Sequence, residues 1–419
     1  MAKIAILGFG VIGSGVFEVL GKNAELIKQK AGQEVCVKYV LDKREPDDPD
    51  AKKLLVNNFD VIAEDDEIRA VVEAMGGLEP AYGFARRALS KGVAYITSNK
   101  ELVARHGQEL SALAAENKTN FFFEASVAGG VPVLRTLSEA LISDHVTGIT
   151  GILNGTTNYM LTEMTKIAKG EVRSGGKSFD ETLKAAQDLG YTEVNCANDI
   201  GGYDTCRKLA ILLSMATGRQ ADYQNIPTEG IAGISTPEAV YSRMLGSTIK
   251  LLAMAEITDE GVIASVAPAL IPNSHQLSTV ADVFNAVYFK GEMFGDIMLY
   301  GPGAGKLPTA TAVIADIIAA VRHKGICVSP RWSGEPLTII TGDGQTVQKL
   351  VRVKYTNRQN AVLAVLRIFG GVELMEPPSL ENEFAFVTRP DVSRDLDAKL
   401  NELMYTSGVS QIPTRIRLL

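Results

Sequence analysis

The fold of this chain is decided near its start by the stretch Lys3-Ile4-Ala5-Ile6-Leu7-Gly8-Phe9-Gly10-Val11-Ile12-Gly13-Ser14-Gly15. An apolar run of strand length leads into glycines, and a pattern of helical period follows as far as about residue 21. The spacing Gly8-x-Gly10-x-x-Gly13 suits a tight turn, a close approach of the backbone to a pyrophosphate, and packing of the helix on the strand. In this context the motif predicts a dinucleotide-binding βαβ unit. A glycine turn with a purely structural role is the alternative.

Strands and helices are expected to alternate through about residues 1–135. Strand candidates lie at 35–41, 61–62, 70–74, 94–97 and 120–124, and helical stretches at 80–90 and 102–117. This alternation predicts an α/β fold whose first domain is a doubly wound parallel sheet of the Rossmann type. An apolar helix at about 308–321, which follows a glycine cluster, is expected to complete this domain within residues 301–327.

Two segments at the ends of predicted strands are candidates for cofactor binding. Asp42 closes the second strand, where a carboxylate would bind the ribose hydroxyls of NAD, whereas Lys43 and Arg44 could bind the 2′-phosphate of NADP. The segment Thr97-Ser98-Asn99-Lys100 follows another strand, at the sheet edge where open α/β folds bind ligands. The choice between NAD and NADP stays open, and a solvated charged turn is the alternative for Lys43 and Arg44.

The remainder of the chain predicts two further domains. Residues 136–300 are expected to form an α+β substrate-binding and dimerisation domain, with strands at 145–153, 249–257, 262–270 and 296–300 and a long helix at 203–218. A linker at 328–344 is rich in Gly and Pro. The elements in residues 345–419 then follow the order βαββαβ, which predicts a ferredoxin-like unit.

Composition excludes several classes of function. The chain has 419 residues, 46% of them hydrophobic and 22% charged, which is ordinary for a globular protein of two or three domains. Its net charge is −7, and no block of Lys or Arg predicts nucleic acid or an anionic membrane as a partner. No apolar run has the length of a membrane helix, and the first residues lack the form of a secretory signal. A soluble, cytoplasmic protein with reduced cysteines is therefore expected.

Lys208 and the carboxylates that precede it form a second candidate site. Lys208 follows Asp204 by four residues on a predicted helix, so the two side chains lie on one face. Glu193 and Asp199 crowd the stretch before them. Several carboxylates beside one cation suit an ammonium-bearing substrate as well as a lysine that acts as a general acid. The alternatives are an ordinary helix salt bridge for Asp204 and Lys208, and a solvated side chain for Lys100.

The chain resembles the homoserine dehydrogenase family in motifs that follow one another in the family's order. They include Glu73-Ala74-Met75-Gly76-Gly77-Leu78-Glu79-Pro80-Ala81, Ser98-Asn99-Lys100-Glu101-Leu102-Val103-Ala104, Glu124-Ala125-Ser126-Val127-Ala128-Gly129-Gly130-Val131-Pro132 and Gly151-Ile152-Leu153-Asn154-Gly155-Thr156-Thr157-Asn158-Tyr159. The resemblance implies reversible hydride transfer between NAD(P)H and L-aspartate 4-semialdehyde. The product is L-homoserine, on the route to threonine and methionine.

The resemblance also implies roles for single residues. Lys208 is cast as the proton donor to the developing alkoxide, and Lys100 as a second lysine near the nicotinamide and the substrate. This agrees with chemistry, because a nearby ammonium both stabilises and protonates an oxyanion. The other implied residues are Glu193, Asp204, Asp199, Gly190 and Thr156 for the substrate, Gly305 for the nicotinamide, and Glu124 with the carbonyls of Val127, Gly129 and Val131 for a monovalent cation (Na⁺ or K⁺). A purely structural Glu124 is the alternative.

Some positions depart from the family pattern. Val194-Asn195-Cys196 replaces an acidic residue and a proline, Gly201 stands where Glu is frequent, and Leu41 stands where Arg is common, which leaves NAD plausible. The unit at 345–419 resembles a regulatory ACT domain, which implies an allosteric amino acid such as L-threonine. Its first loop, at 356–360, lacks the usual Asp-x-Pro-Gly. A purely oligomer-forming role is therefore the alternative, and a homodimer or homotetramer is expected.

Two rival functions stand beside this interpretation. One is a related amino-acid-biosynthetic reductase, for instance a phosphorylating enzyme, which needs a nucleophilic cysteine. Only Cys327 has a histidine close by in sequence, at the end of a predicted apolar helix. The other is a non-catalytic nucleotide-sensing homologue, since fold alone does not fix function. The joint presence of Lys100, Lys208, Glu193 and Asp204 argues against the sensor.

Overall fold

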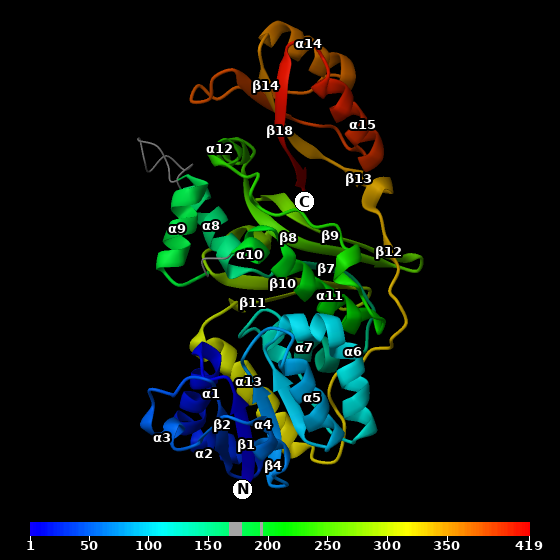
Figure 1. Ribbon diagram of the computed structural model, residues 1–419. Helices are drawn as coiled ribbons and strands as arrows, with labels where there is room; N and C mark the ends of the chain where they lie inside the picture. The colour runs from blue at the N-terminus through cyan, green and yellow to red at the C-terminus, as the bar shows by residue number, and fades with distance from the viewer. Residues whose placement is uncertain (167–177, 193–195) are drawn as a thin grey trace. The chain divides into compact units, whose positions relative to one another are not determined.

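The computed structural model describes residues 1–166, 178–192 and 196–419, and the chain divides into two compact units (Figure 1). The first unit comprises Met1–Ile149, Cys206–Ile226 and Asn285–Thr338. The second comprises Thr150–Thr205, Pro227–Phe284 and Ile339–Leu419. Each unit is therefore assembled from segments that are distant in sequence. The predicted division into domains at 1–135, 136–300 and 345–419 stays a prediction.

The first unit contains a sheet of six parallel strands in the order β3-β2-β1-β4-β5-β6. The chain moves outward from β1 to β3, returns to β4 on the other side of β1, and continues to β6. This order creates a switch point between β1 and β4, and it confirms the predicted Rossmann-type α/β fold. The strands are β1 (Ala2–Leu7), β2 (Val35–Leu41), β3 (Leu55–Val56), β4 (Ile68–Glu73), β5 (Ala94–Thr97) and β6 (Phe121–Phe122).

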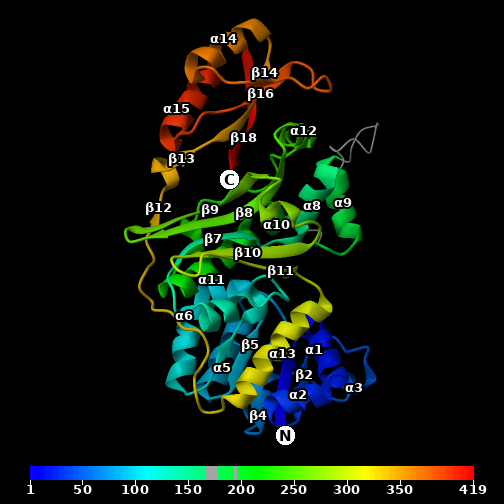
Figure 2. The same ribbon diagram turned by 180° about the vertical axis from the view of Figure 1, so that it is seen from behind.

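Helices cover both faces of this sheet (Figures 1 and 2). On one face α1 (Val11–Lys22), α2 (Ala24–Ala31) and α13 (Lys306–Arg322) share a core with the strands, in which Val16, Val313 and Ile317 meet Ile4 and Ile6. The gold α13 lies beside the blue α1 in both views. The core of this sheet is thus completed by a helix about 300 residues downstream of β1. The other helices of the region are α3 (Pro49–Lys52), α4 (Phe59–Ala63), α5 (Ala81–Ser90) and α6 (Lys100–Glu116).

The predicted strand at residues 61–62 is wrong, because both residues lie in α4. The Asn58 side chain accepts a hydrogen bond from the Asp60 N–H and so caps this short helix. The strand of this region is the preceding β3, which pairs with the end of β2. A two-residue apolar run cannot distinguish a helical turn from a strand, so the cap was the better signal.

The later parts of the first unit add the short helix α7, most of the longer helix α11 and a second group of strands. Strands β11, β10 and β7 are neighbours in that order. Strand β7 ends, and helix α11 begins, in residues that belong to the second unit. These elements are α7 (Val133–Arg135), β7 (Val146–Ile152), α11 (Tyr203–Thr217), β10 (Phe284–Gly291) and β11 (Asp296–Pro302).

The second unit is built on a mixed sheet. The long antiparallel pair β8 (Ser247–Thr258) and β9 (Gly261–Pro272) is extended by β18 (Val409–Leu418), which pairs with β9 in parallel. This unit also contains α8 (Gly155–Lys166), α9 (Phe179–Asp188), α10 (Ala197–Ile200), α12 (Thr236–Met244) and the two-residue strands β12 (Ile339–Ile340), β13 (Thr346–Val347) and β17 (Asp391–Val392).

The C-terminal part of the second unit follows the order β14-α14-β15-β16-α15-β18, apart from the short β17 before α15. Its antiparallel strands lie in the order β18-β14-β16-β15. A core of Val351, Phe384, Phe386, Leu396 and Leu400 joins the sheet to its two helices. The elements not yet bounded are β14 (Lys349–Tyr355), α14 (Arg358–Phe369), β15 (Leu374–Met375), β16 (Glu383–Val387) and α15 (Ser393–Met404).

A buried arginine ties this C-terminal part to α12. Arg352, on β14, donates from Nε and Nη2 to both oxygens of Glu383, at 2.9 and 2.7 Å, and from Nη1 to Glu238 of α12 at 2.7 Å. The three side chains are at most 8% exposed. Burial opposes ionisation of Glu238, but hydrogen bonds from Ser235, Thr414 and Arg352 and the Arg352 charge hold its pKa below the usual value. The cation therefore compensates two buried carboxylates at once.

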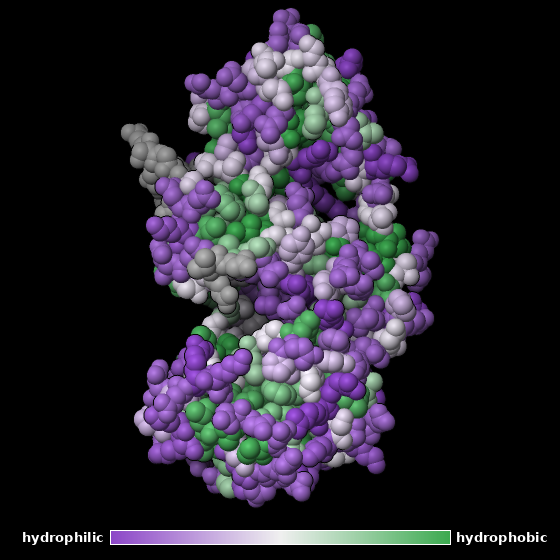
Figure 3. All heavy atoms as spheres, in the orientation of Figure 1, coloured by the Kyte–Doolittle hydropathy of each residue, from purple (hydrophilic) through white to green (hydrophobic). Residues whose placement is uncertain are grey.

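Among the described residues, no helix combines the length and the apolar character needed to cross a bilayer. Figure 3 shows that hydrophilic side chains cover most of one face and that hydrophobic ones form small, separate groups there.

Candidate functional site

The glycine turn between β1 and α1 has the geometry that its spacing predicts. Gly8 adopts a φ of +87°, and a Cβ on it would lie 2.8 Å from the Ala74 carbonyl oxygen. A Cβ on Gly13 would lie only 1.9 Å from the Gly8 carbonyl oxygen, so only glycine permits this turn. Gly10 caps α1 and faces open space, with no heavy atom within 4 Å of the position that a Cβ would take. The exposed face of the turn is therefore free for a phosphate group to approach the helix N-terminus.

Asp42 is bonded directly to this glycine turn. Its carboxylate accepts the Phe9 N–H at 2.6 Å and the Arg44 N–H at 2.8 Å. Burial raises the pKa of Asp42, but the two N–H groups and the nearby Arg44 charge outweigh it and hold the pKa below its usual value. Asp42 is thus ionised beside the turn, whereas Lys43 and Arg44 are exposed.

Glu73 is a residue at this sheet edge that sequence reasoning did not select as a site residue. It ends β4, pairs in register with Thr97 at the end of β5, and is buried. The Thr97 hydroxyl donates to Glu73 Oε2 at 2.5 Å, and the N–H groups of Met75 and Gly76 donate to Oε1. The signal was available, since Thr97 ends the predicted strand 94–97 and Glu73 lies one residue before the end of the predicted strand 70–74, and the two strands are predicted to be parallel. Glu73 fixes the loop after β4 against Thr97.

Lys100 begins helix α6 at the carboxyl edge of the parallel sheet. Asn99 caps the helix by accepting the Leu102 N–H at 3.1 Å, and its amide donates to the Gly77 carbonyl. Lys100 and the neighbouring Ser98 are half-buried. Lys208, also half-buried, lies on α11 one turn after Asp204, as the predicted helix requires. Both lysines belong to the first unit.

The second unit brings together Asp199, Asp204 and the loop between β7 and α8. The Asn154 amide donates from Nδ2 to Asp199 at 2.8 Å and to Asp204 at 2.9 Å, and the Thr192 hydroxyl donates to the other Asp199 oxygen. The Thr156 hydroxyl donates to the Tyr191 carbonyl at 2.8 Å. The two aspartates therefore lie together on Asn154, whereas Thr156 is bonded to the backbone of Tyr191; that the three bind the substrate stays a prediction.

Gly190 and Glu193 are the other two residues predicted to bind the substrate. Gly190 ends the helix α9 with a φ of +72°, and its N–H donates to the Gln187 carbonyl, so its conformation serves the turn that leads to Tyr191. Glu193 lies outside the described residues.

Glu124 is buried, and its carboxylate holds the start of helix α7. Its two oxygens accept the N–H groups of Leu134 and Arg135 at 2.9 and 2.8 Å. Burial raises the pKa of Glu124 above its usual value, while these N–H groups and the Arg135 charge act in the opposite direction. Within the described chain, no group of three or more His, Cys, Asp and Glu side chains is placed to hold a metal ion.

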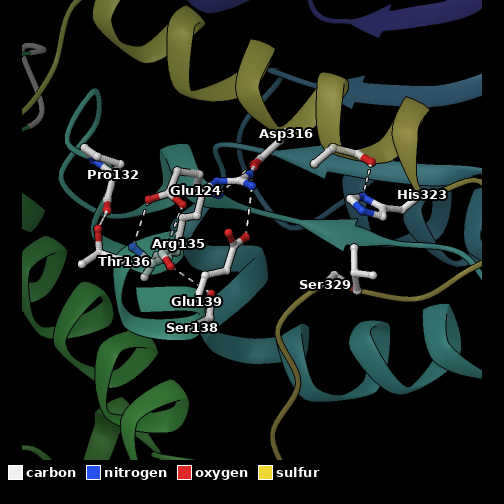
Figure 4. A network of polar contacts seen from close by, with 12 residues as sticks. Glu124, Pro132, Arg135, Thr136, Ser138, Glu139, Asp316, His323 and Ser329 are labelled. Carbon is white, nitrogen blue, oxygen red and sulfur yellow. Dashed lines mark hydrogen bonds and ion pairs between the residues drawn. The ribbon is translucent and has the colours of Figure 1, made fainter. Parts of the chain in front are cut away.

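Asp316 of α13 completes this network, as Figure 4 shows. Its carboxylate accepts the Glu124 N–H at 2.9 Å and an Arg135 guanidinium N–H at 2.8 Å, and Arg135 also pairs with Glu139. Full burial, followed by the Glu124 charge, raises the pKa of Asp316 to about 7. Sequence reasoning missed Asp316, which lies 192 residues from its partner.

The loop after Glu124 packs tightly against the segment before α13. Gly129 has a φ of +58°, and a Cβ on it would lie 2.3 Å from the Gly303 carbonyl oxygen. The Gly130 N–H donates to the Pro302 carbonyl. Gly305, the N-cap of α13, is exposed and has a φ of +121°. The predicted cation loop therefore lies directly against the segment that leads to the predicted nicotinamide loop.

Alanine substitutions in the glycine turn separate folding from cofactor binding. Gly13→Ala should lower the stability of the first unit by about 1 to 3 kcal/mol, since its Cβ overlaps the Gly8 carbonyl. Gly10→Ala meets no protein atom, so it should keep the thermal midpoint of the native chain and weaken binding of NAD and NADP only by obstructing the pyrophosphate. Thermal unfolding and calorimetric titration measure the two effects. A Gly10→Ala variant that binds both cofactors as tightly as the native chain would place the pyrophosphate elsewhere.

Family models and curated proteins that match this chain all point to one family. The family described as homoserine dehydrogenase matches residues 132–318, and the NAD-binding domain of homoserine dehydrogenase matches residues 8–124. Homoserine dehydrogenase of Bacillus subtilis is 39% identical over 332 residues, which are 78% of this chain and 74% of that protein. The enzyme of Helicobacter pylori is also 39% identical, over 77% of this chain and 74% of its own length.

Solved structures agree with the sequence matches. A homoserine dehydrogenase from Thiobacillus denitrificans aligns with a TM-score of 0.89 at 32% identity, over 100% of this chain and 98% of that one. A hyperthermophilic archaeal homoserine dehydrogenase in complex with NADPH aligns with a TM-score of 0.63 at 25% identity, over 76% of this chain and 97% of that one. The first alignment extends over the C-terminal part as well.

Proposed function

Because the chain belongs to the homoserine dehydrogenase family, as an NAD(P)-dependent oxidoreductase acting on a CH–OH group, we propose how its own residues carry out the reaction. The reaction interconverts L-homoserine and L-aspartate 4-semialdehyde. The observation that carries the assignment is the match to the family over more than three quarters of the chain, joined to a glycine turn that only glycine permits. The bound nicotinamide supplies the hydride chemistry, and the protein positions the substrate and moves the proton.

Lys208 is the general acid and base of the proposed reaction. When hydride reaches the aldehyde carbon, the carbonyl oxygen becomes an alkoxide, and Lys208 gives it the proton that completes L-homoserine. In the reverse direction neutral Lys208 takes the hydroxyl proton as hydride leaves. Lys100 provides a second positive charge near the same oxygen, which stabilises the alkoxide before the proton arrives.

The amino acid end of the substrate is assigned to the loop between β7 and α8 and to the aspartates of α10 and α11. Asp199 and Asp204 already lie together on Asn154, and Thr156 holds the Tyr191 carbonyl beside them. Glu193, Gly190 and Thr156 complete the proposed set. Carboxylates suit the substrate ammonium, because charge-assisted hydrogen bonds are stronger than neutral ones.

Cofactor binding is assigned to the turn at 8–13, to Asp42, to the segment 97–100 and to Gly305. Ionised Asp42, fixed by two backbone N–H groups, is ready to accept the ribose hydroxyls of NAD. Lys43 and Arg44 are exposed beside it and offer positive charge for the 2′-phosphate of NADP. Either cofactor therefore fits these residues.

A monovalent cation, Na⁺ or K⁺, is assigned to Glu124 and the carbonyls of Val127, Gly129 and Val131. Support comes from the buried carboxylate and from a loop held rigidly by Gly129. Each Glu124 oxygen accepts one N–H and keeps a lone pair for a cation.

Cation dependence is tested by homoserine oxidation in NaCl, KCl and tetramethylammonium chloride at equal ionic strength. We expect the rate in the bulky cation to fall well below the rates in the small ones. Glu124→Gln should remove this dependence. Equal rates of the native chain in all three salts would contradict the cation site and leave Glu124 as a helix cap.

The C-terminal part of the second unit is proposed to be an ACT-like regulatory domain that binds L-threonine. The chain is proposed to form a cytoplasmic homodimer or homotetramer. The support is its order of elements and its shared sheet with β9. Calorimetry with L-threonine tests the proposed binding, and sedimentation of the native chain tests the proposed oligomeric state. Absent threonine binding would leave a purely oligomer-forming unit.

A further inference from the structure

Asn154 uses its whole hydrogen-bonding capacity in a way that fixes the orientation of its amide. It lies between β7 and α8 and is only 5% exposed. Its oxygen accepts the backbone N–H of Thr157 at 2.8 Å and the Thr157 hydroxyl at 3.1 Å. A backbone N–H can only donate, so the amide oxygen must face Thr157 and the amide nitrogen must face the other way.

The amide nitrogen faces Asp199 and Asp204 from two different helices. Both carboxylates accept from Nδ2, at 2.8 and 2.9 Å, so the two accepting oxygens lie less than about 6 Å apart. Asp204 is 3% exposed, and Asp199 is fixed from its other side by the Thr192 hydroxyl. Two carboxylates at this distance repel each other. A neutral amide keeps them together but adds no positive charge of its own.

We propose that Asn154 is a positioning residue that sets the spacing of Asp199 and Asp204, so that both can accept N–H bonds from the α-ammonium group of the substrate. The inference rests on the proposed function. An α-ammonium has three N–H donors and one positive charge, which suits a pair of carboxylates held apart by a fixed donor. Asn154 itself does not touch the substrate.

Asn154→Asp tests this role with almost no change in size. The variant replaces the shared donor by a third acceptor, so the carboxylates lose their spacer and gain a repelling neighbour. We expect the KM for L-homoserine to rise about 10- to 100-fold, the usual scale for a lost hydrogen bond to a charged group. The Kd of the cofactor should be unchanged, because the Asn154 side chain is bonded to Thr157, Asp199 and Asp204, none of which is assigned to the cofactor. The kcat should fall far less than the KM rises.

Asn158→Ala, on helix α8 four residues after Asn154, is the control. The Asn158 amide donates to the carbonyls of Val280 and Phe284 and accepts from the buried Lys250, so its loss disturbs α8 and has no direct contact with the aspartates. Both variants are compared with the native chain in thermal midpoint, cofactor Kd, kcat and KM. Only Asn154→Asp should show the selective rise in KM.

The outcomes separate the inference from the proposed function. An Asn154→Asp variant with a KM within twofold of the native value overturns the inference. A second result also overturns it: an Asn154→Asp variant with a lower thermal midpoint, a weaker affinity for the cofactor and a higher KM, all changed as in Asn158→Ala. Such a joint change is what the loss of a structural residue produces. A folded native chain that binds cofactor but does not oxidise L-homoserine overturns the proposed function first.

Discussion

Replacing Lys208 by alanine should lower kcat for homoserine oxidation about 10²- to 10⁴-fold, the usual contribution of a general acid and base. Hydride transfer from homoserine requires a base that removes the hydroxyl proton, and the reverse reaction requires an acid that protonates the alkoxide; Lys208 is proposed to do both. Binding of NAD or NADP should stay close to native, since the glycine turn and Asp42 lie on other elements. Steady-state or stopped-flow absorbance of the reduced nicotinamide measures the rate of homoserine oxidation, and calorimetry measures the affinity for NAD or NADP.

Lys208→Arg separates charge from proton transfer. Arginine keeps the positive charge, but its pKa is too high for it to act as the base in homoserine oxidation. We expect Lys208→Arg to be nearly as inactive as Lys208→Ala, and the exposed Lys91→Ala to behave as the native chain. Equal loss of activity and cofactor binding in Lys208→Ala would make the residue structural, and the catalytic role would then have to pass to Lys100.

Replacing Arg352 by methionine should lower the free energy of unfolding of the second unit by about 3 to 5 kcal/mol, since it leaves Glu238 and Glu383 buried without their cation. Methionine has a similar length, so the loss is mainly electrostatic. Urea unfolding followed by circular dichroism is the suitable measurement. Tryptophan fluorescence would not be, because the only Trp, Trp332, belongs to the first unit.

Arg358→Met provides a control of the same geometry. Arg358 donates from Nε and Nη2 to both oxygens of Glu376, as Arg352 does to Glu383, but at an exposed position. Its loss should leave the urea midpoint almost unchanged, because water solvates the remaining carboxylate. Equal midpoints for the two variants would show that the buried network does not stabilise the unit.

Acid should weaken the same network in the native chain. The pKa of Glu238 in the folded chain lies below its usual value. Its ionised carboxylate therefore contributes fully to the free energy of unfolding above the usual carboxyl pKa, and this contribution is lost as pH falls through the folded-state pKa. The difference in urea midpoint between the native chain and Arg352→Met should therefore narrow at acid pH.

Local patterns predicted the two ends of the chain well. The order strand, glycines and helix at residues 3–21 has few alternatives, and it appears as β1, the turn and α1. The order βαββαβ predicted for residues 345–419 is also observed, apart from the short β17, with α15 at Ser393–Met404 as its second helix. In both places each element carries its own periodicity and its own end signals, so no distant contact is needed to define it.

Helix α12 was missed although its signal is present in the sequence. Ser235 and Glu238 have the spacing of a capping box, and Pro237 stands in the first turn. The Glu238 carboxylate does accept the Ser235 N–H at 2.8 Å. Attention to this start signal would have found the helix without any structure.

The polar clusters could not be predicted, because their members are distant in sequence. Asn154 meets Asp199 and Asp204 across 45 and 50 residues, and Arg352 meets Glu238 across 114. Nothing local to Asn154 distinguishes it from the neighbouring Asn158, whose amide binds backbone carbonyls instead. Sequence reasoning named the aspartates and required the fold to supply the residue that joins them.

The most direct test of the whole account is the absorbance of reduced nicotinamide when the native chain is mixed with L-homoserine, in parallel with NAD and with NADP. We expect reduction of at least one cofactor. The ratio of the two rates shows whether Asp42 or the pair Lys43 and Arg44 decides the preference. Reduction of neither cofactor, by folded protein that binds NAD or NADP, would contradict the account and favour another substrate or a nucleotide-sensing role.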